Sequence, residues 1–259
     1  MIKFNREEGS CPNVLTERGI SEVESLVLSF ENDIESFKSK TSKELFKSDI
    51  YGCSDVKDKL KEIQHNKCCF CESYITHISY GDVEHFRPKA GWVQENEGIN
   101  KPGYFFLAYD WNNLMLSCTI CNQRNKRNFF PLENPAFRTN ITEAYNINNE
   151  QPLFIDPFID NPEEHIEFVE ELPRAKNSSL KGEKTIEFLD LQRNELNEIR
   201  NDYISLLNSL KETMLNNTFS SEIREYAKSQ LKKELNEKFS KNRPYLAMLK
   251  CNFKEFLNE

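Results

Sequence analysis

Two Cys-x-x-Cys pairs, Cys68 with Cys71 and Cys118 with Cys121, restrict most strongly how this chain of 259 residues can fold. Each pair can direct two thiolates at one tetrahedral ion, about 2.3 Å from each sulfur, and zinc is the natural occupant of such a site. A zinc ion closed by four cysteines has no open position, so it would stabilise the fold and would not catalyse. The alternative is two unrelated pairs of buried thiols. Cys69 does not match the spacing of the second pair, and we expect it to be a bystander.

The expected location of the protein and its net charge exclude some classes of function. No apolar run approaches the roughly 20 residues that span a bilayer, and the first residues lack the apolar core of a signal peptide. We therefore expect a cytoplasmic protein without a membrane partner, where paired thiols more often hold metal than form disulfides. The formal charge of −8 argues against a free-standing, sequence-indifferent nucleic-acid binder. If the chain acts on nucleic acid, a local feature or a partner must supply the attraction.

Hydrophobic spacing predicts helices before the first cysteine pair. Apolar side chains between Ile20 and Phe37 recur three and four residues apart, which places them on one stripe of a helix. Ser54 can cap a second helix that leads directly to Cys68. Between the pairs, short stretches interrupted by Gly, Pro and aromatic residues favour strands and loops.

The part after the second pair is first irregular and then helical. Prolines interrupt residues 136–182, where one short buried strand is expected at 153–155. A helical stripe follows, formed by Leu196, Ile199, Tyr203, Leu206, Leu210 and Met214. Further helices are expected at 221–239 and after Pro244.

These patterns predict a mostly α protein with a modest β element. We expect an N-terminal helical region at 1–66, a cysteine-containing core at 67–135, an irregular connector at 136–182 and a C-terminal helical region at 183–259. The last of these is our candidate for docking a partner, because amphipathic helices often bury their stripe against another chain. Packing within the chain is an equally good use of any one stripe.

The segment from Gly81 to Lys89 gathers two carboxylates, an imidazole and two cations between the cysteine pairs. Such a cluster is a candidate catalytic site. A lone histidine such as His85 is more often structural or solvated, but the flanking pairs favour a functional role. The other histidines are expected to be structural or surface residues: His65, His77 and His165.

A basic segment follows the second pair. Asn122 and Lys126 are four residues apart, so an α-helix would place them on one face, where they offer an amide oxygen to a hard metal ion and an ammonium to a phosphate. The alternative is a solvated basic helix end, where cations complement the helix dipole.

The order of these motifs resembles a known family. The chain carries Cys-x-x-Cys, Val-Glu-His-Phe-Arg-Pro-Lys, Trp-Asn-Asn-Leu, Cys-x-x-Cys-Asn and a Lys four residues after that Asn. This order is similar to HNH endonucleases with a zinc-stapled ββα-metal (His-Me finger) core. More narrowly, residues 67–131 resemble the PtuB-type HNH nucleases of bacterial anti-phage Septu systems and of related retron systems. Outside those residues the likeness is one of size and helical layout.

The resemblance implies a role for each motif residue. His85 would be the general base that deprotonates a water, and Glu84 a ligand of a divalent ion. Asn122 stands where such nucleases place a His or Asn ligand, and Asn113 would tie down the loop that presents His85. Many HNH enzymes have Asp and His where this chain has Glu84 and Asn122. Because both keep an oxygen ligand, the second site suits Mg²⁺ or Mn²⁺ better than zinc.

Two features of the candidate site stay open. Adjacent strand residues point to opposite faces, so Glu84 and His85 converge only if the strand ends or bends there. Asp82 shares the face of Glu84 and is the reserve ligand. The cations expected to hold neighbouring phosphates are Arg87, Lys89 and Lys126.

Our first functional hypothesis is a metal-dependent HNH endonuclease that hydrolyses phosphodiester bonds of DNA as an anti-phage effector. The resemblance implies a PtuA-like ABC-type ATPase as partner, which could also provide the nucleic-acid surface. Its retron branch implies an alternative effector that cleaves RNA such as tRNA, with a retron reverse transcriptase and its RNA–DNA hybrid as partners. A hypothesis of another class is a non-catalytic zinc module that binds nucleic acid or protein.

Overall fold

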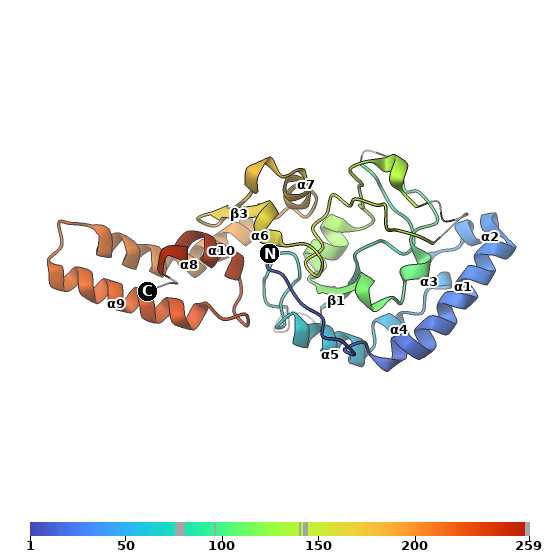
Figure 1. The fold of residues 1–259 in the computed structure, drawn as a ribbon, viewed down its shortest axis with the longest axis horizontal. Helices are drawn as coiled ribbons and strands as arrows, with labels where there is room; N and C mark the ends of the chain where they lie inside the picture. The colour runs from blue at the N-terminus through green and yellow to red at the C-terminus, as the bar shows by residue number, and fades with distance from the viewer. Residues whose placement is uncertain (76–80, 96, 140, 142–144, 257–259) are drawn as a thin grey trace.

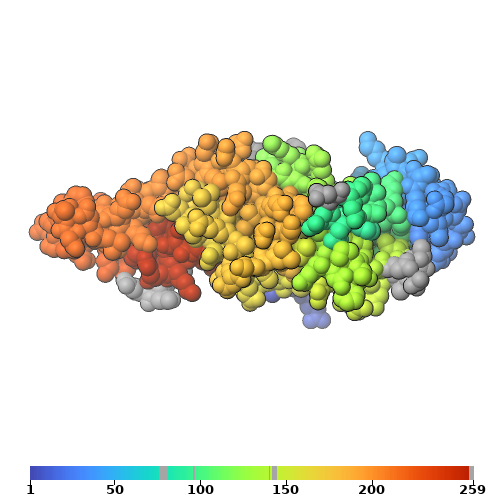
Figure 2. Space-filling model, turned by 90° about the horizontal axis from the view of Figure 1, so that it is seen from above, coloured from blue at the N-terminus to red at the C-terminus, as the bar shows by residue number. Residues whose placement is uncertain are grey.

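The computed structural model of the chain describes residues 1–75, 81–95, 97–139, 141 and 145–256. Within these ranges the chain is mostly helical, as predicted, and forms two small antiparallel sheets of two strands each. Figure 1 shows helices at both ends of the molecule with the sheets between them. The space-filling view shows an elongated body that tapers toward α8 and α9 (Figure 2). None of the helices in these ranges combines the length and the apolar character needed to cross a membrane.

The N-terminal region is helical but more broken than its pattern suggests. Its helices are α1 (Ile20–Asn32), α2 (Ile34–Ser39), α3 (Ser42–Leu45), α4 (Ser48–Tyr51) and α5 (Ser54–Ile63). The single helix expected over 20–37 is interrupted at Asp33, whose backbone is extended and whose carboxylate accepts a hydrogen bond from Ser36 N (2.9 Å). This cap ends α1 and starts α2. Phe30 and Phe37 still meet in the core, with ring centroids 5.4 Å apart.

The first sheet and the helix after it lie between the two helical ends. Strand β1 (Asp82–His85) pairs antiparallel with β2 (Leu114–Ser117), so that His85 lies opposite Leu114. After β2 the chain enters η4 (Ile120–Lys126), a π-helix. The side chain of Gln64, at the end of α5, both donates to and accepts from the backbone of Leu116 in β2, at 2.7 and 2.8 Å. The element order is therefore strand, strand, helix, held against α5.

The connector contains a hairpin that the sequence pattern did not reveal. Strands β3 (Ile166–Val169) and β4 (Leu172–Ala175) pair with each other and lie between α6 (Pro162–His165) and α7 (Leu180–Phe188). The strand expected at 153–155 is wrong. Phe154 and Ile155 are fully buried, but Ile155 N donates to the side chain of Thr185 (2.9 Å) and not to a neighbouring strand. Burial alone therefore explains the apolar run.

The C-terminal region is a helical hairpin followed by a shorter helix. Its elements are α8 (Asn194–Leu215), α9 (Ser221–Lys238) and α10 (Leu246–Phe253), close to the predicted positions. The predicted stripe of α8 is partly wrong, because Ile199 and Leu206 are 54% and 52% exposed. The residues that α8 buries are Leu196, Arg200, Ile204 and Leu207. The buried face is rotated because α8 packs against α9 and also, through Arg200, against Phe168 of β3.

Candidate functional site

The four cysteines predicted to bind zinc come together in the structure. Their Sγ atoms all lie within 4.8 Å of one another, and those of Cys71 and Cys118 are 3.9 Å apart. A tetrahedral ion about 2.3 Å from each sulfur requires sulfurs roughly 3.8 Å apart, so the group could hold a metal ion. The neighbouring Cys69 thiol is buried but lies outside this group.

Donors surround these sulfurs, which we call the cysteine clip (Cys68, Cys71, Cys118 and Cys121). The backbone N–H of Cys121 points at Cys118 Sγ (3.5 Å), and Ser73 Oγ lies 3.4 Å from Cys71 Sγ. Arg193, the N-cap residue that precedes α8, brings Nη2 to 3.9 Å from Cys121 Sγ. Hydrogen bonding from neighbouring thiols, Cys118 first, holds the pKa of Cys71 well below its ordinary value. Burial raises the pKa of Cys68, and hydrogen bonding within the cluster raises that of Cys121, so in the absence of metal the thiolate is favoured at Cys71.

A second group of side chains meets where β1 ends. A cavity of about 350 Å³ is lined by residues from β1, from the loop after it and from η4. The lining includes Glu84, His85, Lys89, Asn122 and Arg127. Because β1 ends at His85, Glu84 and His85 both reach this cavity although they are adjacent in the strand. We call this space the β1 cavity.

His85 is held in one orientation. Its Nε2 lies 2.9 Å from the carbonyl oxygen of Ala108, and its Nδ1 lies 3.2 Å from Nζ of Lys89. A carbonyl only accepts, so Nε2 carries the hydrogen and Nδ1 presents a lone pair. Burial and, next, the Lys89 charge hold the pKa of His85 well below its ordinary value. The imidazole is therefore neutral and offers Nδ1 as a base.

Lys126 is not available to a phosphate, which corrects the role expected for it. Its side chain is fully buried, and Nζ donates to Glu84 Oε1 (2.7 Å) and to the backbone oxygen of His85 (3.1 Å). Burial raises the pKa of Glu84, and the nearby Lys126 opposes that rise. Lys126 therefore neutralises the carboxylate beside the cavity.

The helix type explains why the sequence pointed to Lys126 and missed Arg127. In an α-helix, residues four apart share a face, which pairs Asn122 with Lys126. In the π-helix η4 the bonds run from i+5 to i, and Arg127 N donates to Asn122 O (2.8 Å). Arg127, exposed and with a φ of 47°, thus lies beside Asn122 on the β1 cavity. Such a φ is uncommon for a residue other than glycine and often accompanies functional sites.

Arg87 lies apart from the β1 cavity. Its Nε donates to Glu150 Oε2 (3.0 Å), and the residue lines a different cavity of about 620 Å³, together with Glu150, Asp156 and Lys181. As placed here, Arg87 does not meet His85 around one phosphate. Of the three predicted phosphate contacts, only Lys89 lines the β1 cavity.

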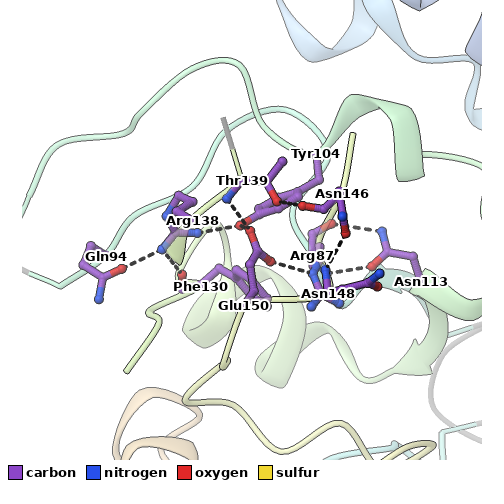
Figure 3. Close-up of polar contacts among 10 residues, drawn as sticks. All are labelled: Arg87, Gln94, Tyr104, Asn113, Phe130, Arg138, Thr139, Asn146, Asn148 and Glu150. Atoms are coloured by element: carbon purple, nitrogen blue, oxygen red, sulfur yellow. Dashed lines mark hydrogen bonds and ion pairs between the residues drawn. The ribbon is translucent and has the colours of Figure 1, made fainter. Parts of the chain in front are cut away.

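The side chain of Asn113 forms hydrogen bonds to the backbone of Arg87, as Figure 3 shows. Its Oδ1 accepts from Arg87 N (2.8 Å), and its Nδ2 donates to the carbonyl oxygens of Arg87 (3.0 Å) and Leu107 (3.1 Å). These bonds hold the segment that follows His85. Asp82, the reserve ligand, instead accepts from the side chain of Gln123 (3.0 Å).

The remaining histidines lie elsewhere. His165 Nδ1 is 2.8 Å from Ser179 Oγ, and His65 lines a separate cavity near the N-terminus. His77 lies outside the described residues. Among the described histidines, His85 is the one on the β1 cavity.

Comparison with known proteins places the chain in a family. It is 35% identical over 233 residues to the Septu protein PtuB of Bacillus mycoides strain KBAB4, which covers 83% of this chain and 78% of that protein. It is 27% identical over 145 residues to the Septu protein PtuB of Bacillus thuringiensis, covering 56% of this chain and 44% of that protein. The chain therefore belongs to the Septu PtuB family.

The chain is also similar to a part of another Septu protein. It is 28% identical over 152 residues to PtuA of Bacillus mycoides strain KBAB4, which covers 58% of this chain and 21% of that protein. No family model matches the chain. No solved structure matches it. Membership of the HNH class therefore stays a prediction from the motif.

Proposed function

We propose that this PtuB-family chain is a metal-dependent endonuclease of the HNH type. It would hydrolyse phosphodiester bonds of DNA as the effector of an anti-phage Septu system. The observation that supports this most is the β1 cavity, where His85, Glu84 and Asn122 meet from β1 and η4. A protein that only needed a zinc clip would not require this group.

In this proposal His85 is the general base. Ala108 O fixes the ring through Nε2, and Nδ1, which here accepts from Nζ of Lys89, would take a proton from a water in the cavity once that ammonium turns to a phosphate. Lys89 Nζ lies where it can contact both that water and a phosphate oxygen, 3.2 Å from Nδ1. The neutral state of the buried ring suits the task, because only the unprotonated imidazole accepts a proton.

Glu84 and Asn122 are the proposed ligands of a divalent ion, Mg²⁺ or Mn²⁺. Such ions are commonly held by one or two carboxylates, with water and substrate phosphate completing the set, so this pair of oxygen donors fits them. When bound, the ion would neutralise charge that builds up on the phosphate and on the leaving oxygen. Lys126, 2.7 Å from Oε1, favours the ionised form of the Glu84 carboxylate against burial, which raises its pKa. Asp82, paired with Gln123, stays the reserve ligand.

Lys89 and Arg127 are the proposed phosphate contacts at the cavity, in place of Lys126. Both line it, and Arg127 is exposed on the side of η4 that Asn122 shares. A guanidinium suits bidentate contacts with phosphate oxygens, whereas a lysine acts as a point charge. Arg87 would act on the nucleic acid only from the neighbouring cavity.

The cysteine clip is proposed to hold structural zinc. Four thiolates close the coordination sphere, so this ion would bind no substrate. It would join the segment before β1 to the stretch that runs from the end of β2 into η4. Asn122 follows Cys121 directly, so the clip also anchors one proposed ligand of the β1 cavity.

The family name motivates the proposed partner. The relatives are named as Septu proteins, and we propose that the chain acts in anti-phage defence with a PtuA-like ABC-type ATPase. The C-terminal region 183–259 is the proposed docking region, where α8 exposes Ile199 and Leu206. A retron reverse transcriptase with its RNA–DNA hybrid is the partner set of the alternative, in which the substrate is tRNA.

One experiment tests the nuclease proposal and separates the substrates. The chain is purified with its genomic neighbours and incubated with plasmid DNA and with total tRNA, with and without Mg²⁺. We expect Mg²⁺-dependent cleavage of DNA that His85→Ala abolishes while zinc content and circular dichroism stay unchanged. Cleavage of the tRNA pool alone would select the RNA alternative. Wild-type cutting by His85→Ala would reject His85 as the base, and binding without any cutting would favour the non-catalytic zinc module.

A further inference from the structure

We propose that Glu150, in the connector, is a positioning residue for His85 and Lys89. The inference rests on the proposed nuclease function. Glu150 does not line the β1 cavity; it reaches the segment that carries both side chains through Arg87, which lies midway between them in sequence.

The carboxylate of Glu150 is fully buried, and each oxygen has a separate set of partners. Oε2 accepts from Nε of Arg87 (3.0 Å). Oε1 accepts from the hydroxyl of Tyr104 (2.8 Å) and from the backbone N–H of Thr139 (3.1 Å). Figure 3 shows these contacts on either side of the carboxylate. Tyr104 and Thr139 thus hold Oε1 in place, while Oε2 holds the side chain of Arg87.

Tyr104, which holds Oε1 of Glu150, is itself held in place by Arg138. Nη1 of Arg138 donates to the Tyr104 hydroxyl (2.7 Å), and its Nη2 donates to Gln94 Oε1 (2.6 Å) and to Phe130 O (2.8 Å). The guanidinium also stacks on Trp92, 3.8 Å from the ring centroid. Glu150 is therefore a rigid support rather than a mobile surface group.

The segment from His85 to Lys89 is held through its backbone by a few hydrogen bonds, of which the first runs from Nζ of Lys126 to the carbonyl oxygen of His85 (3.1 Å). Phe86 N donates to Asn113 O (2.9 Å), and Asn113 also bonds the backbone N–H and carbonyl of Arg87. Tyr104 N donates to Pro88 O (2.9 Å). Glu150 adds the hold on the Arg87 side chain, which is only 11% exposed.

Loss of the Glu150 charge would leave Arg87 in a buried position without its counter-charge. Removing one partner of such a pair is strongly unfavourable, so the guanidinium would move toward water in the larger cavity it lines. Because Arg87 lies between them in the chain, this movement would pull against the bonds from Asn113, at the end of the 3₁₀-helix η3 (Trp111–Asn113), and would shift His85 on one side and Lys89 on the other. Misplacement of reacting groups by about 1 Å can reduce a rate about a hundredfold.

Glu150→Gln is the decisive variant, and Tyr104→Phe is its matched control. Glutamine has the same shape, but its single oxygen can occupy only one of the two positions, and its amide nitrogen then faces the N–H of Arg87 or of Thr139. Tyr104→Phe removes a hydrogen bond to the other oxygen and leaves the Arg87 contact in place. We expect Glu150→Gln to lower kcat about ten- to hundredfold with KM little changed, and Tyr104→Phe to keep kcat near the wild-type value.

The double variant Arg87→Gln with Glu150→Gln covers the case in which Glu150→Gln folds poorly, because two amides can pair without an isolated charge. If Glu150 acts through Arg87, adding Glu150→Gln to Arg87→Gln causes no further loss of kcat. Independent action would instead multiply the two losses. That multiplication, or wild-type kcat in folded Glu150→Gln, would overturn the proposal.

Hydrogen exchange separates this inference from the nuclease proposal. We expect the backbone amides of Phe86, Arg87 and Lys89 to exchange faster in Glu150→Gln than in Tyr104→Phe. If the wild-type chain with its partner cuts no nucleic acid, the nuclease proposal fails, and this comparison alone decides whether Glu150 holds the segment. Equal exchange in the two variants would overturn the positioning role.

Discussion

Nζ of Lys126 lies 2.7 Å from Oε1 of Glu84, and neither side chain is more than 4% exposed. The pair joins η4 to β1 beside the β1 cavity, which Glu84 lines. Two charges removed from water in this way depend on each other, because each supplies the other's main compensation.

Lys126→Met should therefore lower the free energy of unfolding by about 3–5 kcal/mol, since it leaves a buried carboxylate without a partner. Urea denaturation followed by circular dichroism measures the change. Arg124→Gln, two residues earlier on the exposed side of η4, is the control and should unfold at the wild-type urea concentration. Equal midpoints for the two variants would mean that the pair contributes nothing.

We expect substitutions of the neighbouring residues Cys68 and Cys69 to affect zinc binding differently. Cys68→Ala should reduce bound zinc below one per chain and lower the melting temperature, because three thiolates hold the ion less tightly than four. Cys69→Ala, also buried but outside the clip, should keep one zinc per chain. Metal analysis and thermal melts check both variants. Full zinc in Cys68→Ala would contradict the ligand set.

Substitutions of the neighbouring residues Asn113 and Asn112 should have different effects on stability. Asn113→Ala removes three partly buried hydrogen bonds to the backbone of Arg87 and Leu107, so we expect a loss of about 2–3 kcal/mol in stability. Asn112 is exposed, and Asn112→Ala should change stability by less than about 0.5 kcal/mol. Guanidinium titrations measure both. The prediction fails if the exposed and the buried substitution have the same effect.

Arg193 connects α8 to the cysteine clip and should slow the loss of its metal. Removing a side chain that supports metal ligands typically weakens binding about ten- to a hundredfold. We expect Arg193→Met to release zinc to a chelator faster by about that factor. Arg174→Met removes an exposed arginine of β4 and should leave the rate unchanged. Identical release from both variants would remove Arg193 from the clip.

Lys89 predicts a pH dependence of stability. Burial lowers the pKa of Lys89 to about 8, while Glu84 opposes the shift. Between that value and its ordinary pKa the unfolded chain binds more protons, so the penalty for burying the charge decreases as pH rises. At pH 7, Lys89→Met should raise the free energy of unfolding by about 2–3 kcal/mol. The advantage should shrink between pH 8 and 10.

Urea titrations at four pH values measure this difference between wild type and Lys89→Met. Lys43→Met is the control for the loss of an exposed lysine. A difference that grows as pH rises would reverse the expected sign and would show that Lys89 is more easily charged in the folded chain.

Several features followed from local sequence. Cysteine spacing indicated the clip because ligands two residues apart converge on one ion whatever lies around them. Helical periodicity located α5, α8, α9 and α10 to within a few residues. It did not locate the break at Asp33, where a single capping side chain outweighs the apolar stripe.

The sequence by itself determined the four clip cysteines, the helical regions and the motif that resembles PtuB-type nucleases, because each depends on spacing along the chain. Only the tertiary structure decided which charged side chains reach the β1 cavity. Lys126 pairs with Glu84, Arg87 with Glu150, and the π-helical turn brings Arg127 beside Asn122. These choices depend on which segment lies opposite in space, since a buried charge goes wherever its counter-charge is found.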